Sequence, residues 1–110
     1  MTSGNELQKE SRFACNMLAL DAEQRNRHEL LVHGLREWQS EIRELPNGYA
    51  FRFSNDANMI RDLAEFIANE WLCCPFFDFE LKVERESGLL WLGITGREGV
   101  KPFIRMEFGI

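Results

Sequence analysis

The segment GYAFRFSNDANMIRDLAEFIANEWLCCPFFDFELKV, residues 48–83, holds a strand pattern, a helix pattern and a second strand pattern in succession. In its first and last parts, apolar residues alternate with small or polar ones, as in strands with one buried face. Between them, apolar residues recur at helical spacing from Met59 onward. A polar stretch rich in N-cap residues precedes this helix. The helix should end near Cys73, because Pro75 disfavours helical geometry at Cys74.

A helix and a short strand are predicted before this segment. Asp21 followed by Gln24 fits an N-cap with a reciprocal partner, and the helix should run to about Ser40. Its apolar stripe is His28, Leu31, Leu35, Trp38 and Ile42. Residues 41–45 then read as a strand that turns through PNG, residues 46–48, where Asn-Gly should supply the positive φ angles of a hairpin.

After the segment we expect a second hairpin and a last helix. A turn at residues 86–88 leads into an apolar strand, residues 89–94, which should be central in the sheet or covered by a partner. Residues 95–98 fit a capping box for a helix through Phe108, although Pro102 would then lie inside it. The order α-β-β-α-β-β-α predicts an α+β fold, with a four-stranded, mostly antiparallel sheet and helices packed on one face.

The chain has 110 residues, 45% hydrophobic and 28% charged, which is typical of one globular domain that folds without a metal or a disulfide. Residues 1–12 are polar and are predicted to be a mobile tail, so the single domain is assigned to residues 13–110. The net charge is −5 and the basic residues are scattered, which argues against nucleic acid or a membrane as a partner. With no long apolar run and no signal-peptide pattern, a cytoplasmic location is expected.

Glu70 is the most informative residue, because helical spacing places it on the apolar stripe with Leu63. A buried carboxylate costs several kcal/mol unless it is paired, protonated or bound to a cation. Cys73 and Cys74 follow at i+3 and i+4, the offsets that bring helical side chains together. We therefore expect these three side chains to converge. An ion pair with an arginine such as Arg52 is the alternative explanation for Glu70.

Adjacent thiols are soft ligands that favour zinc, copper(I) or a heavy-metal or metalloid ion. Two neighbouring side chains do not readily supply two corners of an unstrained tetrahedral site, so a further ligand is expected from Cys15 or His28. In the cytoplasm all three cysteines should be thiols rather than disulfides. The alternatives are that Cys73 and Cys74 are buried structural thiols and that His28 is structural or solvated.

The string EWLCCPFFDF, residues 70–79, resembles a group of small uncharacterised bacterial proteins that carry a Glu-x-x-Cys-Cys-Pro-Phe signature. GYAFRF before it and LGITGREG after it belong to the same likeness, which extends from Ala14 to about Phe103 and includes Cys15. Arg97 stands where the group favours proline. The group has no settled activity, so the resemblance implies that the Glu-Cys-Cys cluster matters without naming a reaction.

Three functions remain open. The first is a thiolate-based binder of a soft metal or metalloid through Glu70, Cys73 and Cys74. The second is a non-catalytic interaction module, such as a homodimer, that uses the second apolar face around Trp91. The third is a thiol redox enzyme. It is disfavoured, because a ring closed between adjacent cysteines is strained and a helix C-terminus disfavours a thiolate. A catalytic role is therefore not the favoured interpretation.

Overall fold

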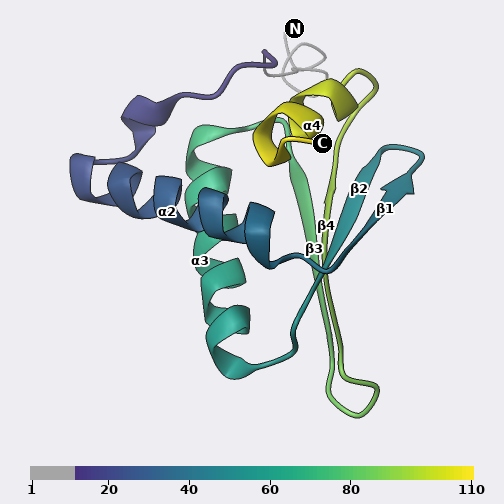
Figure 1. The fold of residues 1–110 in the computed structure, drawn as a ribbon. Helices are drawn as coiled ribbons and strands as arrows, with labels where there is room; N and C mark the ends of the chain where they lie inside the picture. Colours follow the sequence, from purple (N-terminus) through teal and green to yellow (C-terminus); the bar gives the residue numbers. More distant parts are fainter. Residues whose placement is uncertain (1–11) are drawn as a thin grey trace, which may run out of the picture.

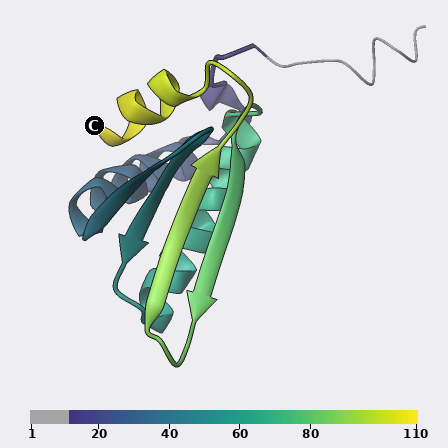
Figure 2. The same cartoon turned by 90° about the vertical axis from the view of Figure 1, so that its right-hand side faces the viewer.

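The computed structural model describes residues 12–110, so the predicted tail lies outside the described residues except for Arg12. The described elements are η1 (Met17–Ala19), α2 (Ala22–Trp38), β1 (Glu41–Leu45), β2 (Gly48–Phe53), α3 (Ala57–Cys73), β3 (Asp78–Glu84), β4 (Leu89–Thr95) and α4 (Lys101–Phe108). Figure 1 shows α2 and α3 on one side of the sheet, and Figure 2 shows the opposite face turned to the viewer. The predicted α+β fold and element order are confirmed.

The sheet has the strand order β1-β2-β4-β3, and all three pairings are antiparallel. β4 lies between β2 and β3, with Leu92 opposite Phe51 on one side and Leu81 on the other. Leu90, Leu92 and Ile94 are fully buried. The apolar character of residues 89–94 therefore reflects a central strand, one of the two predicted explanations.

The first hairpin forms where predicted, but the reason given for its glycine is wrong. Leu45 pairs with Gly48, so Pro46 and Asn47 form the loop. Among the described residues, positive φ angles occur only at three other glycines, Gly88, Gly99 and Gly109. A Cβ atom on Gly48 would lie 2.0 Å from the carbonyl oxygen of Ile94. Glycine is needed here because the backbones of β2 and β4 approach closely.

Both long helices begin at the predicted caps. Asp21 and Gln24 form the reciprocal capping box of α2, with bonds of 2.8 and 2.9 Å between backbone N–H groups and side-chain oxygens. Asp56 caps α3 by accepting from the backbone N–H of Met59 at 2.9 Å. α3 ends at Cys73, two residues before Pro75, as predicted. Local sequence signals therefore set these helix limits.

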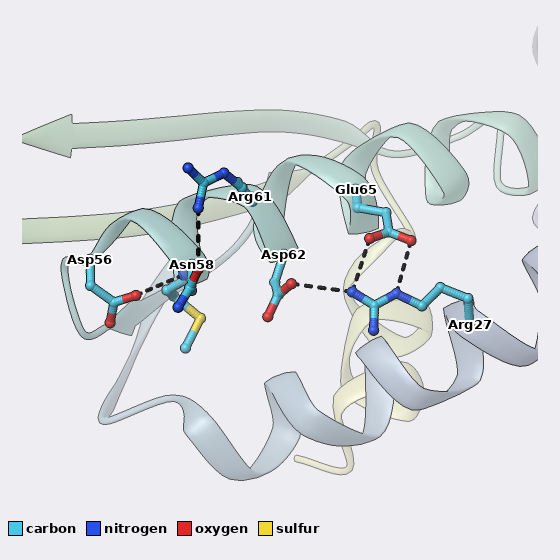
Figure 3. A network of polar contacts seen from close by, with 7 residues as sticks. Arg27, Asp56, Asn58, Arg61, Asp62 and Glu65 are labelled. Carbon is cyan, nitrogen blue, oxygen red and sulfur yellow. Dashed lines mark hydrogen bonds and ion pairs between the residues drawn. The ribbon is translucent and has the colours of Figure 1, made fainter.

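Surface ion pairs join α2 to α3 along one side. The guanidinium of Arg27 in α2 donates to Glu65 at 3.0 Å and to Asp62 at 3.2 Å, both on α3 (Figure 3). Exposed pairs of this kind contribute little to stability, so the packing of α2 on α3 rests mainly on their buried apolar side chains.

The start of the last helix corrects the sequence analysis. α4 begins at Lys101, and its N-cap, Val100, makes no side-chain capping bond. Thr95 cannot cap it because Thr95 is still paired in β4. Pro102 occupies the second helical position, where its missing N–H removes no helical hydrogen bond.

The core lies between the sheet and the helices. Its largest buried apolar side chains are Leu20, Leu31, Leu35, Phe51, Phe53, Leu63, Phe66, Leu90, Leu92, Ile94 and Ile104. Trp38 was placed on the apolar stripe of the first helix but is 45% exposed, which corrects that assignment. Among the described residues, no helix has the length and apolarity needed to cross a membrane.

Candidate functional site

The last turn of α3 and the chain before η1 lie side by side at one end of the molecule, close to α4 (Figures 1 and 2). The helix closes with a bond of 2.7 Å from the N–H of Cys74 to the carbonyl of Glu70. The N–H of Asn16 donates to the carbonyl of Cys73 at 2.6 Å. This backbone pairing brings Cys15 beside Cys74, with their Cα atoms 4.5 Å apart.

Cys15 and Cys74 form a disulfide, and Cys73 is a free, buried thiol. The prediction that all three cysteines are thiols is therefore wrong for this structure. The physical reason is the backbone contact at Asn16, which holds the two Cα atoms at a separation that a disulfide can span. The two cysteines are 59 residues apart in the sequence, so no local sequence pattern predicts their pairing.

Glu70 points into the core as predicted, with 1% of its surface exposed. Its partner is His28 of α2, whose Nε2 lies 2.7 Å from Oε1 of Glu70. Arg52 instead pairs with Glu41, so the suggested Glu70–Arg52 ion pair is wrong. His28 is 3% exposed and stacks on Phe66, which excludes a solvated histidine. The two remaining interpretations of His28 are a structural partner and a ligand.

The predicted convergence of Glu70, Cys73 and Cys74 is present. Sγ of Cys73 lies 3.7 Å from Oε1 of Glu70 and 3.8 Å from Sγ of Cys74. Cys74 is already outside the helix, with φ −123° and ψ 88°, because Pro75 excludes helical geometry there. The departure from the helix turns the chain toward Cys15 while the neighbouring sulfur atoms stay together.

Glu107 of α4 belongs to the same cluster, and the sequence analysis missed it. Its carboxyl group lies near that of Glu70 and within 4.8 Å of the sulfur atoms of Cys15 and Cys74. Burial and the nearby Glu70 raise the pKa of Glu107 to about 9. A signal was present, since Glu107 follows the buried Ile104 by three residues and therefore lies on the same helix face.

Burial shifts the pKa values of three groups in the cluster. Burial raises the pKa of Glu70 and lowers that of His28. Burial, followed by the charges of Glu70 and Glu107, raises the pKa of the Cys73 thiol to about 12. A nucleophilic cysteine needs a depressed pKa, so Cys73 is not an activated thiol.

Two atoms of the cluster lack conventional partners. Among the described residues, Nδ1 of His28 and Oε2 of Glu70 are buried without a hydrogen bond. Both residues line a cavity of about 360 Å³, together with Cys15, Cys74 and Glu107. Buried polar atoms are nearly always hydrogen-bonded, so these two mark a place where a ligand would be accommodated.

The donor atoms form two adjoining groups. Cys15, Cys74 and Glu107 make one, and His28, Glu70 and Cys73 the other, with the donor atoms of each group within 4.8 Å of one another. The groups meet at the contact between Sγ of Cys73 and Sγ of Cys74. The structure therefore gathers the five residues predicted as ligands, and Glu107 is a sixth.

Comparisons with protein-family models, with curated proteins and with solved structures found no match to this chain. The resemblance to the Glu-x-x-Cys-Cys-Pro-Phe group therefore stays a prediction. The molecule is defined by its own features, as a small α+β protein with a buried cluster of sulfur, carboxyl and imidazole groups at one end of the sheet.

Proposed function

We propose that the reduced protein binds a soft metal or metalloid ion through Cys15, Cys73 and Cys74. The observation that carries the proposal is the meeting of three sulfur atoms from two segments that lie far apart in the sequence. A single buried cysteine is commonly a small apolar side chain. Three at one point, beside carboxyl and imidazole groups, form a donor set that suits zinc, copper(I) or a heavier thiophilic ion.

The oxygen and nitrogen groups have supporting roles in this proposal. Glu70 accepts a hydrogen bond from the Cys73 thiol and orients it, and His28 fixes Glu70. Thiols must lose their protons to become ligands, so ion binding releases protons.

The disulfide makes reduction a condition of binding, because two of the three sulfur atoms are joined to each other in the oxidised protein. This condition fits a role in a reducing compartment such as the cytoplasm. A redox enzyme has less support, since the raised pKa of Cys73 leaves almost no thiolate to attack a substrate near neutral pH.

The alternative of an interaction module, as a homodimer, also has less support. The ring of Trp91 was the apolar group proposed for such a contact, but the guanidinium of Arg43 lies over it at 4.5 Å. The same face carries the charged residues Arg52, Glu80 and Lys82. A mixed charged surface with its main aromatic ring covered is not a typical dimer core.

The test is a titration of reduced protein with zinc, copper(I), mercury(II) and arsenite, followed by native mass spectrometry. The protein is first reduced with a phosphine, which is then removed under argon before any ion is added. We expect one ion per chain in the native protein and none in the double variant Cys73→Ser/Cys74→Ser. Circular dichroism establishes that the variant is folded.

A matched pair of variants in α2 separates a site effect from a general one. His28→Gln should weaken ion binding, whereas Arg27→Gln should not, because Arg27 lies outside the cavity and donates to Glu65 on the surface. Retention of every ion by the double cysteine variant, or of none by the native protein, would contradict the proposal.

A further inference from the structure

Resting on the proposed function, we propose that the site takes a trivalent metalloid. The ligand would enter as its neutral trihydroxide, of which arsenite is the accessible probe, and be held as a neutral complex of three thiolates from Cys15, Cys73 and Cys74.

The positions of the sulfur atoms support three-coordinate binding. Cys74 is the common corner, since its sulfur touches that of Cys15 directly and lies 3.8 Å from that of Cys73. A trivalent metalloid binds three thiolates on one side and keeps a lone pair on the other, so it needs no ligand opposite the sulfur atoms. A tetrahedral ion needs a fourth donor. Here Nε2 of His28 and Oε1 of Glu70 already hydrogen-bond each other at 2.7 Å, so neither atom is free to serve as that donor.

The net charge of the complex also favours a trivalent metalloid. Cys73, Cys74 and Glu70 are each 1% exposed, whereas Cys15 is exposed. Three thiolates around a divalent ion leave one net negative charge at this largely buried place, beside the carboxyl groups of Glu70 and Glu107. Around a trivalent centre the charges cancel, which avoids the cost of burying an unpaired charge. The cavity's arginine, Arg36, is exposed and donates to the backbone carbonyl of Glu107.

The unpartnered buried atoms fit a ligand that carries hydroxyl groups. When Nε2 of His28 donates to Glu70, Nδ1 is an acceptor, as is Oε2 of Glu70. Both residues line the cavity of about 360 Å³ beside Cys15 and Cys74. A neutral trihydroxide supplies O–H donors to these acceptors before it reacts, whereas a bare cation supplies none.

The exchange balances without a change of oxidation state. Three S–H bonds and three metalloid–oxygen bonds break, and three metalloid–sulfur bonds form. Each released proton combines with a departing hydroxide to give water. Oε1 of Glu70, 3.7 Å from Sγ of Cys73, is placed to pass one proton from sulfur to the departing oxygen. The Cys15–Cys74 bond must first be reduced by two electrons from a thiol or phosphine reductant.

The experiment uses the full chain, reduced with a phosphine and freed of it, with arsenite as the probe. Native mass spectrometry should show a mass gain of one arsenic less three hydrogens. Alkylation of the complex, followed by denaturation and mass analysis, should find all three thiols protected. This second measurement uses only the native protein and so does not depend on the folding of a variant.

Cys73→Ser provides the discriminating variant. It should lose the three-sulfur arsenite complex but keep mercury(II), which forms a neutral complex with the two remaining thiolates of Cys15 and Cys74. His28→Gln should weaken arsenite binding, and Arg27→Gln, outside the cavity, should leave it unchanged.

The outcomes distinguish the inference from the function on which it rests. An arsenite adduct that retains a hydroxyl group and leaves Cys73 open to alkylation would overturn the three-thiolate assignment. Binding of zinc, copper(I) or mercury(II) without arsenite would overturn the metalloid class and leave the soft-ion function standing. Failure to bind any of the four would remove both.

Discussion

Opening the Cys15–Cys74 disulfide should lower the free energy of unfolding by about 4 kcal/mol. The two cysteines are 59 residues apart, so the bond closes a loop that covers more than half of the chain. The chain-entropy relation for a loop of this length gives roughly 14 cal/mol/K, which is about 4 kcal/mol at 25 °C. Residual structure in the unfolded chain reduces the effect, so this value is an upper bound.

The assay is urea unfolding of the oxidised and the phosphine-reduced protein, followed by the fluorescence of the three tryptophans. The difference between the two forms should persist in Cys73→Ser, which keeps the disulfide, and vanish in Cys15→Ser. Alkylation of the unfolded, unreduced protein should find one free thiol. Three free thiols, or a difference below about 1 kcal/mol in the native protein, would refute the reasoning that the bond restrains the unfolded chain.

Three further predictions concern packing and protonation. Gly48→Ala should destabilise the fold more than Gly88→Ala. The change at Gly88 costs about 1 kcal/mol for its left-handed φ, whereas a Cβ at Gly48 would meet backbone atoms and a Cβ at Gly88 would meet nothing. Equal urea midpoints for the two variants would contradict this prediction. Phe66→Ala should cost about 3–5 kcal/mol in urea unfolding, against about 0.5 kcal/mol or less for the exposed Met106→Ala. Because burial raises the pKa of Glu107 to about 9 from its ordinary 4.5, the folded protein binds that proton more tightly than the unfolded chain, and stability should fall as pH rises through this interval. Glu107→Gln should flatten the fall, and a profile parallel to that of the native protein would count against it.

The element order was predictable because its signals are local. The capping box at Asp21 and Gln24 and the proline after the second long helix each act within a few residues, and the structure follows them. The position of Glu70 on the buried face followed from helical spacing alone.

The other half of the site could not be read from local patterns. His28 and Glu107 reach Glu70 from α2 and α4, and no spacing in the sequence records how those helices pack at the end of α3. The pairing of Cys15 depends on one backbone bond between Asn16 and Cys73. Such contacts are set by tertiary packing, so the residue types were identifiable while their mutual distances were not.

In the proposed function, the disulfide and the bound ion are two ways of closing the same loop. Both join Cys15, in the chain before η1, to Cys74 at the end of α3. An ion held by these sulfur atoms therefore gives the reduced protein back the restraint that reduction removes. Its stabilisation of the folded state grows with the logarithm of the ratio of the ion concentration to the dissociation constant. Oxidation joins two of the three ligands in a disulfide. The oxidised chain is therefore stabilised without an ion and does not bind one. The redox state of the compartment thus decides whether Cys15 and Cys74 are joined directly by a disulfide or through a bound ion.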